Sequence, residues 1–287
     1  MPRPILLTGA SGNVGREVRV SLRARGAAVR LATRDGRADD LSDDENAVRL
    51  DLRDPATFGA AVEGCGALFL LRPPAIADTR ATLVPLVDAA RAAGVGQVVF
   101  LSVAGAGRNP LVPHHAVERH LQDGPGAWTI LRPGFFAQNI GTAYRADVVQ
   151  DDRLYVPAGR GRVAFVDLRD VGEVAARALL APEDFAGQAL TLTGPEAVTF
   201  DDVAALLSAA TGRAVRYDAA SVAGYVRHLR RGGMGWPQAL VQTVLHVGLR
   251  FGQAARVDPT LGAVLGHRPR GVADYVRDHA ALWTGGA

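Results

Sequence analysis

The chain has 287 residues, of which 48% are hydrophobic and 21% charged, and its formal net charge is +3. This length and composition are typical of an ordinary globular protein with one large domain or two smaller ones. All 32 basic residues are arginines, scattered among acidic residues, which argues against a nucleic-acid partner.

The cysteine content and the apolar runs limit the expected environment of the protein. Cys65 is the single cysteine, so an internal disulfide is excluded. No apolar run reaches the roughly 18 residues of a membrane span, and the N-terminus lacks a secretory signal. We therefore expect a cytoplasmic protein with no membrane partner.

The first patterned segment, residues 4–26, predicts a strand, a glycine turn and a helix. Residues 5–7 are wholly apolar, as in a parallel strand buried on both faces. Val14, Val18 and Leu22 then recur every four residues along one helix face. Gly26 follows where a left-handed cap would end that helix.

The glycines between that strand and that helix form the pattern T-G-x-x-G-x-x-G. Missing side chains allow a pyrophosphate to approach the backbone, and the N–H groups and dipole of a helix N-terminus attract its charge. The turn therefore predicts dinucleotide binding, with a merely tight strand–helix turn as the alternative. The candidate binding residues are Thr8, Gly9, Ser11, Gly12, Asn13, Val14 and Gly15.

Strand-like and helix-like segments alternate through the rest of the first half. Strands are expected at residues 28–33, 47–50, 67–71, 97–101 and 128–131, and helices at 54–62, 83–93 and 115–121. Such alternation predicts an α/β fold with a Rossmann-type doubly wound parallel sheet and helices on both faces. We expect this dinucleotide-binding domain to span residues 1–155. The acidic run 39–45 predicts a solvated loop.

Helices dominate the second half, which predicts a mainly helical substrate-binding lobe over residues 156–287. Helices are expected at 170–180 and 201–210, and a strand near 188–193 is expected to return to the sheet. An arginine- and glycine-rich break is expected at 227–235. The mostly apolar segment 236–251 predicts either a helix packed on the core or a lid over an apolar substrate.

The turn after the second strand decides which dinucleotide binds. An acidic side chain there accepts a hydrogen bond from the ribose of NAD, whereas an arginine pairs with the 2′-phosphate of NADP. Arg34 occupies this turn and Asp35 follows it. We therefore expect NADP(H) to be preferred over NAD(H), with an arginine that simply lies at the surface as the alternative.

Other cofactor contacts follow from the expected topology. Ligands of doubly wound sheets lie beyond the carboxyl ends of the strands. The residues at those ends are expected to contact the cofactor: Asp51, Leu52, Leu71, Arg72, Pro73, Ser102, Pro133, Gly134 and Phe135.

Several of these segments resemble the NmrA-like group of atypical short-chain dehydrogenases. They include T-G-A-S-G-N-V-G-R, L-D-L-R-D, L-R-P-P, V-V-F-L-S, H-A-V-E and, most specifically, W-T-I-L-R-P-G-F-F-A-Q-N. The resemblance covers nearly the whole chain and implies an extended Rossmann fold with a smaller C-terminal lobe. It also implies one of three activities, since the group includes NADPH-dependent quinone reductases, ketoreductases of natural-product pathways and NADP-binding redox sensors.

The chain departs from the wider superfamily in its expected catalytic residues. Typical short-chain dehydrogenases combine a serine with Tyr-x-x-x-Lys, whose lysine lowers the tyrosine pKa. This chain has no lysine, and no tyrosine lies between Ser102 and Trp128, so only the serine position is kept. Ser102, His114 and His115 are the candidate catalytic residues, since a serine or a histidine can donate a hydrogen bond to the developing oxyanion. The histidines, one helical turn from Glu118, are also candidate proton donors or substrate hydrogen-bond partners. Solvent-facing histidines are the alternative.

Together these features predict an NADPH-dependent oxidoreductase that reduces a quinone or a conjugated or aromatic ketone. The reduced oxygen of such an acceptor is a stabilised phenolate or enolate, which can take its proton from water. Phe136, Asn139 and Trp236 are candidate substrate-pocket residues, with core packing as the alternative for the two aromatic ones. We expect a hydrophobic small-molecule substrate, no metal site and a monomer or homodimer. The alternative function is a non-catalytic NADP(H)-sensing regulator.

Overall fold

The computed structural model describes residues 3–38 and 45–284 and divides into two compact units. The first, called here the sheet unit, comprises Met1–Pro133 and Leu168–Leu192. The second, the helical unit, comprises Gly134–Asp167 and Thr193–Ala287. This division differs from a single boundary at residue 155, because residues 134–155 pack with the helical unit and residues 168–192 with the sheet unit.

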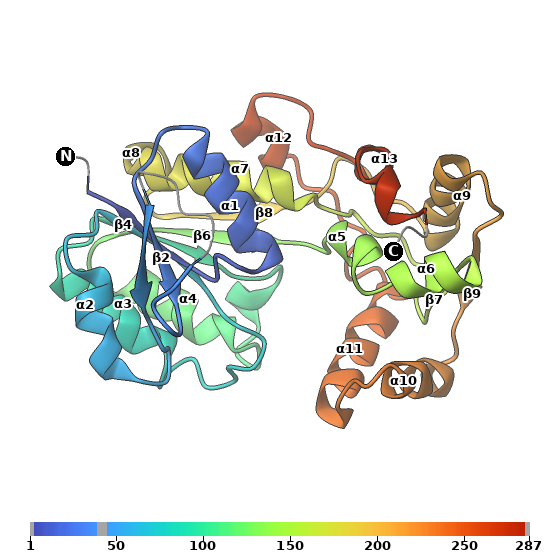
Figure 1. Ribbon diagram of the computed structural model, residues 1–287, viewed down its shortest axis with the longest axis horizontal. Helices are drawn as coiled ribbons and strands as arrows, with labels where there is room; N and C mark the ends of the chain where they lie inside the picture. The colour runs from blue at the N-terminus through green and yellow to red at the C-terminus, as the bar shows by residue number, and fades with distance from the viewer. Residues whose placement is uncertain (1–2, 39–44, 285–287) are drawn as a thin grey trace. The chain divides into compact units, whose positions relative to one another are not determined.

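A seven-stranded sheet forms the centre of the sheet unit (Figure 1). All its strands pair in parallel in the order β3-β2-β1-β4-β5-β6-β8, which confirms the predicted Rossmann-type fold. The strands are β1 (Ile5–Thr8), β2 (Val29–Thr33), β3 (Glu45–Arg49), β4 (Ala67–Leu71), β5 (Gln97–Leu101), β6 (Ala127–Pro133) and β8 (Gln188–Leu192). β8 is the strand that was expected to return to the sheet.

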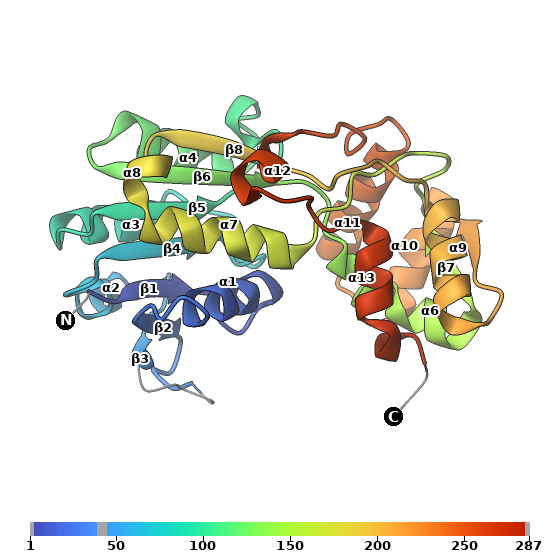
Figure 2. The same ribbon diagram turned by 90° about the horizontal axis from the view of Figure 1, so that it is seen from above.

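Helices cover both faces of this sheet, with α1 and α7 on one face and α2, α3 and α4 on the other (Figures 1 and 2). Apolar packing excludes solvent between the sheet and helices α2–α4, where side chains such as Leu68, Leu70 and Phe100 are fully buried. The helices are α1 (Asn13–Arg23), α2 (Phe58–Val62), α3 (Leu83–Ala92), α4 (His114–Asp123), α7 (Leu168–Leu180) and α8 (Pro182–Phe185), with 3₁₀ turns at Pro55–Thr57 and Ala106–Arg108.

The acidic loop expected at residues 39–45 lies outside the described residues except for Glu45. Glu45 begins β3 and is buried, so the prediction was wrong for this residue. Its carboxylate accepts a hydrogen bond from Arg19 Nε at 2.9 Å and pairs with Arg23. The two guanidinium groups compensate the buried charge, which ties β3 to α1.

The helical unit contains a small parallel sheet, β7–β9, among short helices. Its core is rich in aromatic rings, of which Phe200 packs edge-on against both Tyr144 and Phe165. Its elements are α5 (Gln138–Gly141), α6 (Arg145–Asp151), β7 (Arg153–Val156), α9 (Phe200–Thr211), β9 (Arg216–Ala219), α10 (Val222–Arg231), α11 (Trp236–Leu249), α12 (Thr260–Leu265), α13 (Val272–Asp278) and a 3₁₀ turn at Ala280–Leu282.

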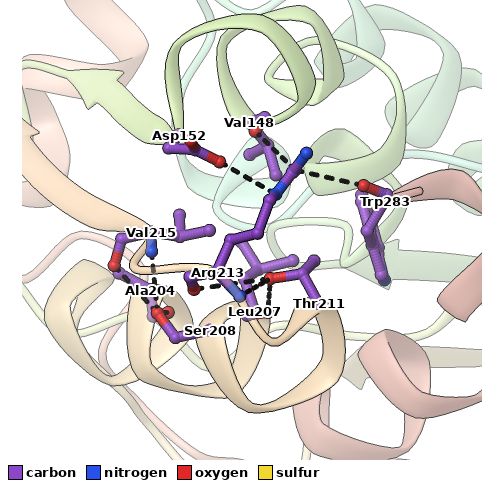
Figure 3. A network of polar contacts seen from close by, with 9 residues as sticks. All are labelled: Val148, Asp152, Ala204, Leu207, Ser208, Thr211, Arg213, Val215 and Trp283. Carbon is purple, nitrogen blue, oxygen red and sulfur yellow. Dashed lines mark hydrogen bonds and ion pairs between the residues drawn. The ribbon is translucent and has the colours of Figure 1, made fainter. Parts of the chain in front are cut away.

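One arginine joins three separate segments of the helical unit (Figure 3). Arg213, in the α9–β9 connection, donates from Nη2 to the carbonyls of Val148 (3.3 Å) and Trp283 (3.2 Å). Its Nε lies 3.0 Å from Asp152 Oδ1, at the end of α6. Since Asp152 adopts a left-handed conformation with φ +47°, this ion pair also holds an otherwise unfavourable backbone turn. The contacts fix α6 and the C-terminal segment to α9.

The break expected at residues 227–235 is shorter than predicted. α10 continues through Arg231, so only residues 232–235 separate it from α11. Arginine is a good helix former and favours a helix C-terminus, whereas the glycines that follow end the helix.

The contact between α1 and α7 depends on a glycine. A Cβ added at Gly172 of α7 would lie 2.6 Å from the backbone carbon of Glu17 in α1. The two helices therefore approach each other more closely than any residue with a side chain would allow.

We expect Gly172→Ala to lower the free energy of unfolding by about 1–3 kcal/mol, because the added methyl group meets backbone that cannot move alone. Urea denaturation followed by circular dichroism measures this loss. Gly59→Ala in α2 is the matched control, since its Cβ would meet nothing within 4 Å. It is expected to be neutral or stabilising by up to about 1 kcal/mol. Equal stability of the two variants would contradict the steric argument.

Candidate functional site

The turn between β1 and α1 is built on close backbone contacts. A Cβ on Gly15 would lie only 2.1 Å from the carbonyl oxygen of Gly9, so residue 15 must be glycine. Gly9 has φ +67°, and a Cβ there would lie 2.6 Å from Leu71 Cδ2. Leu71, at the end of β4, therefore covers the turn from one side.

The first turn of α1 is open to an anionic ligand. Gly12 is the N-cap and supplies no side-chain hydrogen bond, and the first turn contains no acidic residue. The amides of Asn13, Val14 and Gly15 precede the first intrahelical bond, from Arg16 N to the Gly12 carbonyl. Ser11, Gly12 and Asn13 are exposed. These features fit the diphosphate of a dinucleotide.

Thr8 makes two structural hydrogen bonds. Its hydroxyl donates to the carbonyl of Phe69 and accepts from the amide of Leu71, each at 3.0 Å. The side chain thus joins the end of β1 to the end of β4 and fixes the position of Leu71 above Gly9.

The turn after β2 separates the roles of its two charged residues. The Asp35 carboxylate accepts a hydrogen bond from the amide of Arg37 at 3.2 Å, and this bond lowers the pKa of Asp35. Arg34 is exposed, and its side chain makes no hydrogen bond or ion pair with residues 3–38 and 45–284. The carboxylate is therefore engaged in its own turn while the arginine extends into solvent.

At the end of β3, Asp51 and Leu52 form a tight local structure. Asp51 Oδ1 accepts from the amide of Arg53 at 2.9 Å, and Leu52 is buried. Asp51 shapes the connection to the next helix, and Leu52 contributes to the core beneath it.

Arg72, after β4, is engaged by its own loop and by His114. Its Nη1 donates to the carbonyls of Pro73 (3.2 Å), Pro74 (3.3 Å) and Ile76 (2.5 Å). Its Nε donates to His114 Nε2 at 3.3 Å. The side chain thus orders the loop after β4 and orients the His114 ring.

His114 is a neutral imidazole. Burial and, second, the nearby Arg72 lower the pKa of His114 to about 4, although Glu118 acts in the opposite direction. Because Nε2 accepts from Arg72, the proton of the neutral ring lies on Nδ1. Nδ1 is buried and has no hydrogen-bond partner among the described residues. The residue offers an N–H donor but no dissociable acid at neutral pH.

Ser102 belongs to a buried ion-pair network. Its hydroxyl lies 2.5 Å from Glu118 Oε1, to which it donates. Arg132 binds the same carboxylate through Nε at 3.0 Å and Nη2 at 2.6 Å. A Cβ on Gly107 would lie 2.3 Å from Arg132 Nη2, so a larger residue there would displace the Arg132 guanidinium. The Ser102 proton is therefore directed toward Glu118.

His115 donates from Nδ1 to the carbonyl of Ala106 at 2.9 Å, since a carbonyl can only accept. A neutral His115 ring therefore carries its lone pair on Nε2. The two neighbouring histidines present opposite groups, a donor on His114 and an acceptor on His115.

Residues after β6 lie at the start of the helical unit. The carbonyl of Pro133, the last residue of β6, accepts from the amide of Ala104 at 3.0 Å. Gly134 connects it to Phe135, whose ring packs edge-on against Phe165 (5.8 Å) and His246 (5.5 Å between centroids). Phe135 is therefore held from two sides within the helical unit.

His246 and Tyr144 are a buried pair that the sequence patterns did not indicate. His246 Nδ1 donates to the carbonyl of Gln242 at 2.7 Å, and the Tyr144 hydroxyl lies 2.5 Å from Nε2. Burial lowers the pKa of His246 and raises that of Tyr144. Tyr144 caps α6 and His246 lies on α11, 102 residues further along the chain, so no local spacing signals their contact.

The three predicted substrate-pocket residues have different surroundings. Phe136 is half-buried and bridges to Val166 through the backbone. The Asn139 carbonyl accepts from the amide of Tyr144 at 3.1 Å. Trp236 is exposed, and Arg230 lies over its ring with Cζ 5.0 Å from the centroid.

Comparison with known proteins gives consistent matches over nearly the full chain. The model of the NmrA-like family matches residues 1–273. An NAD(P)H azoreductase from Xenophilus azovorans is 32% identical, covering 97% of this chain and 99% of that protein. The oxidoreductase YesF from Bacillus subtilis is 31% identical, covering 98% and 96%.

The fold also matches that of a solved structure. An NADPH-dependent quinone oxidoreductase from Escherichia coli, complexed with NADPH, has a TM-score of 0.86 and 25% sequence identity. The match covers 96% of this chain and 99% of that chain. The resemblance of the sequence motifs is thereby confirmed, and the chain belongs to the NmrA-like family.

Proposed function

We propose that this NAD(P)H-dependent reductase prefers NADPH and reduces a quinone or a conjugated or aromatic ketone. The names of its relatives, an azoreductase and a quinone oxidoreductase, support a flat, conjugated acceptor. The observation that carries the proposal is the state of two candidate acid residues: Ser102 donates its proton in a hydrogen bond to Glu118, and the buried His114 is neutral because its pKa is lowered to about 4.

The β1–α1 turn would hold the cofactor diphosphate through the amides of residues 13–15. Arg34 would pair with the 2′-phosphate, because the neighbouring Asp35 carboxylate is engaged with Arg37. The carboxyl ends of β4, β5 and β6 would receive the nicotinamide end. Pro133, Gly134 and Phe135 stay predicted contacts there. When bound, NADPH supplies a hydride.

The proposed class of acceptor is based on the hydrogen bonds that the candidate acid residues make and on the lowered pKa of His114. Ser102 donates to Glu118, His114 is neutral and His115 donates to a carbonyl. A simple ketone that accepts the hydride would become an alkoxide, which is a strong base and needs an acid in the site to protonate it. A quinone that accepts the hydride becomes a phenolate, which is stable enough to take its proton from water.

The buried Nδ1–H of His114 supports a different contribution to the same step. A neutral imidazole can donate a hydrogen bond to a developing oxyanion without transferring its proton. His114 would thus stabilise the negative oxygen of the acceptor, while Arg72 keeps the ring in the required tautomer.

The function is tested by following NADPH oxidation at 340 nm with a set of benzoquinones, naphthoquinones, conjugated enones and simple aliphatic ketones. We expect turnover with the quinones and enones and little or none with aliphatic ketones. Tight NADPH binding without turnover of any acceptor would refute the proposal and favour a sensing role. Faster reduction of aliphatic ketones would refute the assigned acceptor class.

Arg34→Ala is expected to weaken NADPH binding about 10- to 100-fold, as for loss of charged hydrogen bonds, and to leave NADH binding nearly unchanged. Fluorescence titration with each nucleotide measures both dissociation constants. The control is Arg119→Ala, which removes an exposed arginine of α4 that pairs with Asp123. Equal losses for NADPH and NADH would contradict the assigned role of Arg34.

His114→Gln is expected to slow quinone reduction without removing any ionisation from the pH profile of kcat between pH 5 and 9. The pKa of His114 is lower in the folded chain than in the unfolded chain. The contribution of this residue to wild-type stability is therefore greatest above pH 6.5 and falls toward pH 4. Through His114, the wild type should lose on the order of 3 kcal/mol of unfolding free energy over this pH range. The variant should not show this part of the loss in urea denaturation. His120→Gln is the control. An ionisation near neutral pH that disappears in His114→Gln would identify an acid instead.

A further inference from the structure

α11 is apolar on both of its long faces, although only one of them is packed. Ala239, Thr243, His246 and Leu249 face the core of the helical unit. On the opposite side Trp236, Leu240, Val241, Val244 and Leu245 are each 51–69% exposed. A helix that is hydrophobic all round is normally covered on both sides, and contiguous exposed apolar groups mark an interaction surface.

The same region carries positive charge without any acidic residue. Residues 219–257 contain five arginines and no aspartate or glutamate, whereas the whole chain carries a net charge of only +3. Three of these arginines, Arg227, Arg230 and Arg231, lie in the last turns of α10. These three arginines form no ion pair with the part of the chain that the structure describes.

The positive and the apolar areas of this region are physically joined. α10 and α11 lie next to each other, separated by residues 232–235 (Figure 1). The Arg230 guanidinium lies over the Trp236 ring at 5.0 Å, where the end of one helix meets the start of the other. We call the exposed arginines of α10 and the exposed apolar half of α11 the α10–α11 surface.

Charge decides between the partners that such a surface could accept. A second copy of the chain would bring the unpaired arginines of both α10 helices together, and the segment has no acidic residue to compensate them. A nucleic acid would neutralise the arginines, but its phosphates have no use for exposed leucine and valine side chains. An anionic lipid surface offers negative headgroups and hydrocarbon at adjacent depths.

We propose that the α10–α11 surface docks onto membranes that contain anionic phospholipids. The valine and leucine side chains of α11 enter the headgroup–acyl boundary, and the α10 arginines pair with lipid phosphates. Trp236 suits the interface because its ring is apolar and its N–H is polar. None of the described helices is long and apolar enough to cross a membrane. The proposed attachment is peripheral and departs from the expectation of no membrane partner, which was based on the lack of a membrane-spanning apolar run. It does not depend on the proposed reaction.

The test is sedimentation of the full chain with vesicles of phosphatidylcholine alone and of an equimolar mixture with phosphatidylglycerol. We expect binding only to the mixed vesicles, weakened by salt. Trp236 fluorescence should shift to the blue on binding, and this shift should be absent in Trp236→Phe.

Two variants separate the contributions of charge and apolar area. Arg227→Gln with Arg231→Gln should weaken vesicle binding about 25-fold, or roughly fivefold per arginine. Leu240→Gln, Val244→Gln and Leu245→Gln together should abolish it at any salt concentration. The controls are Arg80→Gln with Arg216→Gln, and Leu111→Gln, which alter exposed residues elsewhere. NADPH binding and circular dichroism should be unchanged in all of these variants.

Each other occupant of the surface gives its own result. A concentration-dependent dimer that the triple glutamine variant abolishes would overturn the proposal in favour of a second copy. Binding to duplex DNA that is as tight as binding to the mixed vesicles, or tighter, would overturn the proposal in favour of a nucleic acid. Equal binding to neutral and anionic vesicles, or binding that neither variant weakens, would also refute it.

Discussion

The candidate cofactor site at the β1–α1 turn depends on one contact between backbone atoms. The carbonyl oxygen of Gly9 occupies the place where a side chain on Gly15 would begin, so the first turn of α1 closes directly onto the end of β1. Thr8 fixes that end to β4, and Gly172 allows α7 to press against α1 from behind. A helix held so closely presents its free amides at one fixed place. The geometry of the site thus depends on glycines, whose lack of side chains allows the backbone segments to approach each other.

Buried charge organises the neighbouring strand ends. Glu118 is fully buried, and its carboxylate is tolerable there because Arg132 binds it through two nitrogens and Ser102 adds a hydrogen bond. Arg72 likewise orders the end of β4, where three carbonyls and His114 receive its N–H groups. These networks keep the strand ends rigid. They also engage the hydroxyl of Ser102, which occupies the serine position of short-chain dehydrogenases and donates to Glu118.

The sequence predicted what local spacing encodes and missed what tertiary contact decides. The glycine turn, the Rossmann-type sheet and the bounds of β4 and β5 follow from apolar runs and glycine positions. Helical spacing predicts Glu118 one turn from the histidines, and α4 confirms this. The ion pair of Glu118 with Arg132, on a strand 14 residues further on, has no local signal. Glu45 was assigned to a loop from its acidic neighbours, although two arginines of α1 make its burial favourable. The Tyr144–His246 pair left no signal at all.

A chain whose only basic residues are arginines and histidines has a restricted chemistry. Guanidinium groups form strong ion pairs and order loops, but they do not release protons near neutral pH. The arginines of this chain do build such pairs with Glu45 and Glu118. Proton transfer then falls to histidine, tyrosine or water, and burial keeps His114 and His246 neutral and raises the pKa of Tyr144. His114, His246 and Tyr144 are therefore poor acids near neutral pH. This agrees with the proposed acceptors, whose reduced form can take its proton from water.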